Sequence, residues 1–166
     1  ALAGKESAYN AAFRRAGVLR ADTTKGLFDC ARALAWCPLS KGNRVAVLTN
    51  AGGPGVTAAD ALEDHGLKMA EFSSETKAAL KDILVPAASL HNPVDMLASA
   101  TPGHFAECLE ILLNDPGVDN VMVIFPTPPS YTAGSVALKM IPVIQQAKKP
   151  VVVTVMGERL SQEAVE

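Results

Sequence analysis

Short runs of apolar, mostly β-branched residues alternate with stretches of helical spacing across most of this chain. We expect strands over 44–49, 67–72, 88–91, 120–126 and 150–156. The run at 120–126, NVMVIFP, is almost continuously apolar, as strands are when helices cover both faces of a sheet. Such alternation is typical of an α/β fold with a parallel sheet between helices. Five strands favour a flavodoxin-like, doubly wound order over a six-stranded dinucleotide fold.

The N-terminal residues do not fit this strand count. We expect a helix over 5–16, an extended piece, and a second helix that ends near Trp36 before the break at Pro38. Residues 1–38 are therefore predicted to be a helical appendage, and residues 39–166 a five-stranded flavodoxin-like domain. The final stretch, SQEAVE at 161–166, is expected to be the start of an incomplete last helix.

Composition excludes several classes of function. The 15 basic and 17 acidic residues give a net charge of -2, and aromatic residues make up 5%, so we expect no nucleic-acid surface. No apolar run reaches the roughly 20 residues that span a bilayer, so we expect no membrane partner. Cys30, Cys37 and Cys108 are odd in number and form no CxxC, which predicts reduced thiols, a cytoplasmic location and no metal site.

The first loop that could bind a ligand is NAGGPG at 50–55, because ligands of open parallel sheets bind beyond the carboxyl ends of the strands. Gly53, Gly55 and Ala58 fit the G-x-G-x-x-G/A pattern, and Glu71 stands where an acid would receive a ribose hydroxyl. An NAD-type dinucleotide module is therefore one alternative. Against it, Pro54 removes one N–H from the anion cradle.

Two more loops follow expected strands, at 91–101 and 126–132. In the former, Asn92-Pro93 requires an extended backbone, and Asp95 is expected to accept backbone N–H groups, with its carboxylate pointing away from any bound anion. Thr101 is expected to cap a helix that begins at Pro102. Two helix N-termini, one after each glycine-rich or small-residue segment, could thus converge on one anion.

The candidate substrate- or phosphate-binding residues share a place in these two segments. They are Asn50, Ala51, Gly52, Gly53, Gly55, Asn92, Ser99, Ala100 and Thr101, and Pro93 and Asp95 are expected to be structural. No Ser-His-Asp or Cys-His spacing predicts a catalytic residue within the chain, and His65 is expected to cap a helix.

Three stretches together resemble the nucleoside-diphosphate-forming acyl-CoA synthetases, the acetate–CoA ligase (ADP-forming) group related to succinyl-CoA synthetase. They are RVAVLTNAGGPGVTAADALEDHGLKMAEFS, NPVDML and ATPGHFAECLEILLNDPGVDNVMVIF, and the resemblance covers about residues 40–166. Residues 1–38 are similar to the tail of the family's preceding flavodoxin-like domain, whose phosphorylated histidine is expected just upstream of Ala1. The chain would then be a fragment of a larger ligase.

The resemblance implies that acyl-CoA, phosphate and ADP are interconverted with the acid, CoA and ATP through that phosphohistidine. Asn50, Gly52 and Gly53 would face the acyl carboxylate or acyl phosphate. The implied partners are a CoA-binding Rossmann domain, the histidine-loop domain and an ATP-grasp domain, which would bind CoA, ADP or ATP, and Mg²⁺; this chain would bind no cofactor itself. A ligase-like domain of a protein acetyltransferase and a homodimer both stay open.

Overall fold

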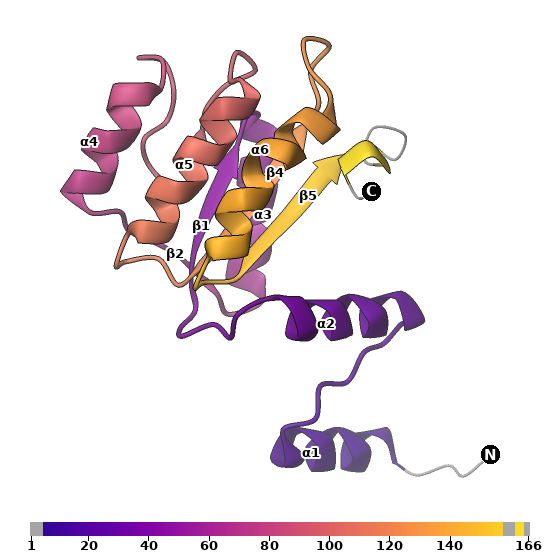
Figure 1. The fold of residues 1–166 in the computed structure, drawn as a ribbon. Helices are drawn as coiled ribbons and strands as arrows, with labels where there is room; N and C mark the ends of the chain where they lie inside the picture. Colours follow the sequence, from indigo (N-terminus) through magenta and orange to yellow (C-terminus); the bar gives the residue numbers. More distant parts are fainter. Residues whose placement is uncertain (1–4, 158–161, 165–166) are drawn as a thin grey trace. The chain divides into compact units, whose positions relative to one another are not determined.

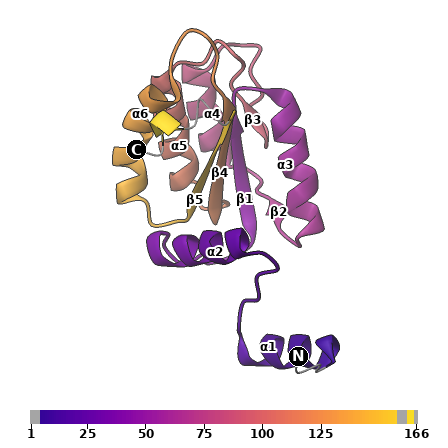
Figure 2. The ribbon, with the colours of Figure 1, turned by 90° about the vertical axis from the view of Figure 1, so that its right-hand side faces the viewer.

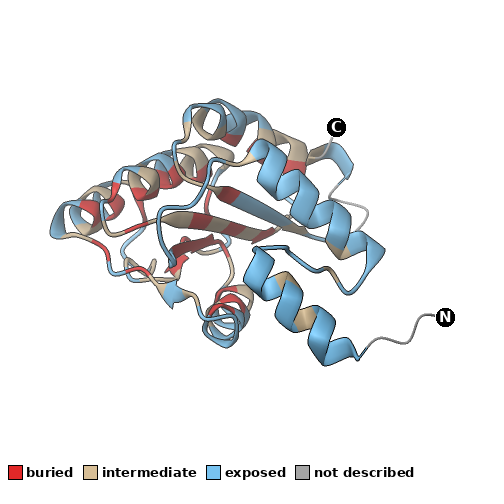
Figure 3. Cartoon of the chain, turned by 90° about the horizontal axis from the view of Figure 1, so that it is seen from below, coloured by how far each residue is buried: buried red, intermediate tan, exposed pale blue. Residues whose placement is uncertain are grey.

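The computed structural model describes residues 5–157 and 162–164, in two compact units, Ala1–Cys37 and Pro38–Glu166. The first unit holds helices α1 (Glu6–Ala16) and α2 (Thr24–Trp36), close to the expected bounds. Gly17 ends α1 in the left-handed conformation, at φ 69, and the Thr23 hydroxyl caps α2 by accepting from the Gly26 N–H. Neither helix buries a residue (Figure 3), so this unit has no core of its own among the described residues.

The second unit is an α/β domain around a parallel sheet (Figure 1). Its strands are β1 (Arg44–Thr49), β2 (Lys68–Met69), β3 (Val94–Asp95), β4 (Asn120–Pro126) and β5 (Val151–Met156). Its helices are α3 (Gly52–Asp64), α4 (Ser74–Ile83), α5 (Pro102–Asn114) and α6 (Ala133–Gln146). In the described part of the chain the five-stranded sheet runs β2-β1-β4-β5, with β3 also paired to β1. The predicted fold class is confirmed.

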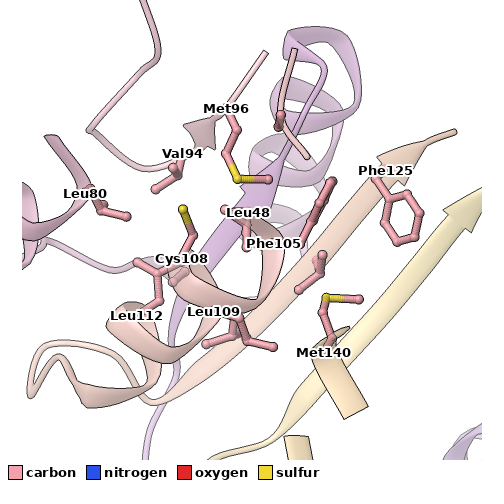
Figure 4. Close-up of a cluster of buried hydrophobic side chains, with 14 of the residues drawn as sticks. Leu48, Leu80, Val94, Met96, Phe105, Cys108, Leu109, Leu112, Phe125 and Met140 are labelled. Atoms are coloured by element: carbon pink, nitrogen blue, oxygen red, sulfur yellow. The ribbon is translucent and has the colours of Figure 1, made fainter. Parts of the chain in front are cut away.

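Helices cover the two faces of the sheet unequally. Figure 2 shows α3 on one side and α4, α5 and α6 on the other. The larger core lies on the three-helix side, where Phe105 and Phe125 meet with ring centroids 5.0 Å apart (Figure 4). The expected stripe of α5 is fully buried there: Phe105, Cys108, Leu109 and Leu112. A smaller cluster beneath α3 contains Val45, Val47, Ala58 and Leu62.

The structure differs from the strands expected at 67–72 and 88–91, and the side chain of Asn92 explains both differences. The Asn92 amide Nδ2 donates to Val45 O (2.7 Å) and to Ala70 O (3.0 Å), and its Oδ1 accepts from Val47 N (2.9 Å). Because this amide stands between β1 and the segment after β2, it takes the place of ladder bonds and β2 ends at Met69. The strand predicted at 88–91 is wrong, since the third strand forms only after Asn92, where β3 pairs with the end of β1.

The remaining described features add little to the fold. Residues 162–164 are helical, while 161, 165 and 166 of the expected last helix lie outside the described residues. Within the part of the chain that the structure describes, no helix has the length and apolar character needed to cross a membrane.

Candidate functional site

Three strands end at one edge of the sheet. Thr49 at the end of β1 pairs with Asp95 of β3 on one side and with Ile124 of β4 on the other. The chain leaves β1 toward β2 through α3, but β4 lies on the opposite side of β1, so β1 and β4 flank the topological switch point. Crevices at such points are where open α/β sheets bind ligands. The glycine-rich loop and the segment before α5 therefore start from the same edge, as predicted.

The turn from β1 into α3 is held by Thr49. Its hydroxyl accepts from Ala51 N (3.1 Å) and donates to Ala51 O (3.1 Å), and α3 begins directly at Gly52. A Cβ on Gly55 would lie 3.2 Å from Thr49 Cγ2 and 3.3 Å from Pro93 Cβ, so glycine lets the first turn of α3 pack tightly. A Cβ on Gly53 would meet nothing within 4 Å.

The start of α3 offers backbone donors. Ala51 is the N-cap and makes no side-chain cap bond, and among the described residues no acceptor pairs with the N–H groups of Gly52 and Gly53. Both glycines are exposed. Unpaired N–H groups and the positive end of the helix dipole favour an anion at this point.

Asp95 stands closer to this site than expected. Its Oδ1 accepts from Leu97 N (2.9 Å), as predicted, but its Oδ2 lies 3.2 Å from where a Cβ on Gly52 would be. The carboxylate thus borders the first turn of α3 instead of pointing wholly away. Leu97 follows at φ 65, in the left-handed region that favours glycine, and this backbone strain belongs to the same loop. An anion at α3 would therefore bind on the Gly53 side, away from the like charge of Asp95.

The start of α5 has fewer open donors than predicted. Thr101 caps the helix by accepting from His104 N (3.4 Å), and Thr101 N donates to His104 Nδ1 (3.2 Å), which completes a capping box. Of the described N–H groups in this first turn, only that of Gly103 is left without a partner. Ser99 is exposed and Ala100 is buried. The α5 terminus can thus contribute one backbone donor.

Asn50 connects β1 to the loop after β4. Its side chain is 3% exposed, and Nδ2 donates to Pro126 O (3.2 Å) and to the Tyr131 hydroxyl (3.2 Å). Burial raises the pKa of Tyr131, and the bond from Asn50 offsets part of this, so the phenol is neutral at physiological pH. The sequence predicts that the loop at 126–132 lies at the ligand-binding end of the sheet, but it does not single out Tyr131 or Thr127. The one sequence feature that could have pointed to these two residues is that each is polar and follows shortly after the carboxyl end of a buried strand.

Two residues that the sequence predicts to bind a ligand, Asn92 and Glu71, lie away from the start of α3. The Asn92 amide is engaged with backbone of β1 and Ala70, away from the α3 terminus. Glu71 remains near the amino end of the sheet, because β2 runs beside the start of β1; its carbonyl would lie 2.5 Å from a Cβ on Gly117, in the turn that precedes β4. The dinucleotide alternative is therefore wrong, since Glu71 is at the opposite edge from Gly53. Among the described residues no cluster of three metal-ligating side chains occurs.

We expect Gly53→Val to abolish anion binding without unfolding the domain. The valine side chain fills the approach to the N–H groups of Gly52 and Gly53, and no neighbour lies within 4 Å of its Cβ. Stability should stay within about 0.5 kcal/mol of the parent, as for other exposed substitutions. Phosphate titration followed by calorimetry measures the loss, and Ala78→Val at an exposed position of α4 is the control. Undiminished phosphate binding by Gly53→Val would contradict this site.

The geometry defines a class: a flavodoxin-like, doubly wound α/β domain with unpaired backbone N–H groups at its switch point. The chain belongs to the Ligase-CoA domain family, whose profile matches residues 45–166. It is 41% identical over 169 residues to the alpha subunit of acetate–CoA ligase [ADP-forming] II of Pyrococcus furiosus, covering 99% of this chain. It is 44% identical over 123 residues to acetate–CoA ligase [ADP-forming] I of Archaeoglobus fulgidus, covering 74% of this chain and 18% of the relative.

Solved structures agree. The dinucleotide-forming acetyl-coenzyme A synthetase 1 of Ca. Korarchaeum cryptofilum, in complex with phosphate and ADP, matches with a TM-score of 0.91 and 32% identity. That match covers 99% of this chain and 36% of the solved chain. The chain likewise spans 37% of the length of the Pyrococcus furiosus subunit.

Proposed function

We propose that this chain is the Ligase-CoA part of an acid–CoA ligase (ADP-forming). The reaction would interconvert acyl-CoA, phosphate and ADP with the acid, CoA and ATP. The observation that carries the proposal is the start of α3, where the unpaired N–H groups of Gly52 and Gly53 stand beside buried Asn50 at the switch point. The identity of 41% to an ADP-forming acetate–CoA ligase subunit supports it.

In this proposal the chain binds and orients the substrate anion and carries out no covalent step itself. The N–H groups of Gly52 and Gly53 would hold the carboxylate or phosphate, with Gly103 N offering a further donor. Each charged hydrogen bond contributes about 1.5–3 kcal/mol and the helix dipole about 0.3–1 kcal/mol. Association costs at least about 4 kcal/mol, so free phosphate held by the two N–H groups of Gly52 and Gly53 alone should bind no tighter than millimolar.

The remaining chemistry would come from other domains or subunits of the same ligase. A histidine outside this chain would carry the phosphoryl group, a CoA-binding Rossmann domain would hold CoA, and an ATP-grasp domain would hold ADP or ATP with Mg²⁺. Phosphoryl transfer depends mainly on positioning and electrostatic stabilisation, so a domain that only fixes the anion can still be essential.

We expect this chain by itself to form no ATP from acetyl-CoA, phosphate and ADP. The phosphoryl carrier and the nucleotide site would lie on other domains, so the chain cannot complete the transfer. A coupled luciferase assay should read the same with and without the chain, while an intact ADP-forming acetate–CoA ligase run in parallel gives the positive signal. Turnover by the chain alone that survives repurification would refute the proposed division of labour.

A further inference from the structure

Two buried side-chain atoms lack a hydrogen-bond partner in the described part of the chain: Asn50 Oδ1 and Thr127 Oγ1. Asn50 follows the last residue of β1, and Thr127 follows the last residue of β4. Nearly all buried polar atoms in folded proteins are paired, so each exception requires a reason. Both exceptions here lie at the carboxyl ends of the two neighbouring strands that flank the switch point. This coincidence indicates a polar group that binds between them.

The orientation of the Asn50 amide is fixed by its neighbours. Nδ2 donates to Pro126 O, and a carbonyl oxygen can only accept. Exchanging the amide oxygen and nitrogen would therefore place two acceptors against each other. Oδ1 must be the acceptor, which means that the group it binds has to bring a hydrogen. Thr127 differs, because its hydroxyl can donate as well as accept.

The anion expected at α3 therefore has to meet two requirements. It must accept hydrogen bonds from Gly52 N, Gly53 N and the Thr127 hydroxyl, and it must donate one to Asn50 Oδ1. An ionised carboxylate or a sulfate can only accept. Hydrogenphosphate meets both requirements, since it keeps one P–OH at neutral pH beside its charged oxygens.

We propose that Asn50 is a specificity-determining residue, which selects phosphate in its protonated form by accepting the P–OH hydrogen at Oδ1. The inference rests on the proposed function and adds the protonation state of the ligand to it. The loop at 126–132 supplies both partners of the Asn50 amide and also carries Thr127.

Calorimetric titration of this chain with phosphate, arsenate and sulfate at pH 8 and constant ionic strength tests the proposal. At this pH phosphate is mostly hydrogenphosphate, which has the same charge as sulfate, while arsenate keeps a proton as phosphate does. We expect phosphate and arsenate to bind at least about tenfold more tightly than sulfate, because sulfate leaves the buried acceptor unpaired. Sulfate binding as tight as phosphate binding would overturn the proposal and leave the anion site itself in place.

Two variants separate the role of Asn50 from general weakening. Asn50→Leu should bring the phosphate-to-sulfate affinity ratio close to one. Thr127→Val removes a donor that serves both anions, so it should weaken both by the same factor and keep the ratio. A ratio unchanged in folded Asn50→Leu would overturn the proposal, and should that variant fail to fold, the three anions on the unmodified chain still decide. If no anion binds, the proposed anion site falls together with this inference.

Discussion

Asn92→Ala is expected to destabilise the second unit by about 2 kcal/mol or more. The substitution removes one amide and leaves two backbone groups without their partner, Val47 N and Ala70 O, while Val45 O keeps its bond from Ala70 N (2.9 Å). Each buried polar group that loses its partner costs about 1–3 kcal/mol, and β1 is buried on both sides of these positions. Urea unfolding followed by circular dichroism measures the change, and the amide hydrogen of Val47 should also exchange faster.

Asn120→Ala is the matched control for this prediction. The Asn120 amide also donates to a backbone carbonyl, Gly42 O (3.1 Å), but at an exposed position where water can replace it. Its loss should cost less than about 1 kcal/mol. Equal costs for the two variants would show that the Asn92 amide is not what joins β1 to the segment after β2.

Asp115→Asn is expected to cost about 2–4 kcal/mol at neutral pH and to change how stability depends on pH. Asp115 is 2% exposed, and its carboxylate accepts from Ser73 N (2.9 Å) and Gly117 N (2.6 Å). Burial raises the pKa of this carboxyl, but the hydrogen bonds from Thr76, Ser73 and Gly117 outweigh it, so the pKa lies below the ordinary 3.8. The isosteric amide keeps the volume and opposes an N–H donor with its own NH₂ group.

The sign of the pH effect follows from this lowered pKa. In the unfolded chain the carboxyl binds its proton near pH 3.8, whereas in the folded chain it does so only at lower pH. The ionised group therefore stabilises the fold above pH 3.8, and this contribution disappears as the pH falls through the folded pKa. Unfolding free energies measured from pH 6 down to pH 2 should fall less steeply for Asp115→Asn than for the parent chain.

Asp60→Ala provides the control for the loss of a carboxylate. Asp60 is exposed on α3, so its removal should change the unfolding free energy at neutral pH by no more than about 0.5 kcal/mol. An equally steep acid limb for Asp115→Asn and the parent would contradict the role assigned to the buried carboxylate.

The sequence by itself determined the features that depend on neighbours along the chain. The three-four spacing of α5 placed Phe105 and Leu109 in the core, and Thr101 before Pro102 located the cap at which that helix begins. His65 caps α3 as expected, with Nδ1 2.8 Å from Ala61 O. The apolar runs of β1 and β4 predicted the two central strands of the sheet, because a strand covered on both faces is apolar throughout. The glycine-rich and Asn-Pro-Val-Asp segments together pointed to the family.

Only the tertiary structure decided which of the loop residues lie at the candidate site. Asn92 bonds to backbone 45 and 47 residues away in sequence, and this contact shortens β2 and keeps Glu71 at the amino end of the sheet. Tyr131 reaches Asn50 across 81 residues, and the two unpaired oxygens appear only when β1 and β4 lie side by side. An amide or hydroxyl has the same local preferences whether it binds backbone or ligand. Which partner such a group finds depends on how the strands pair, and the paired strands are far apart in the sequence.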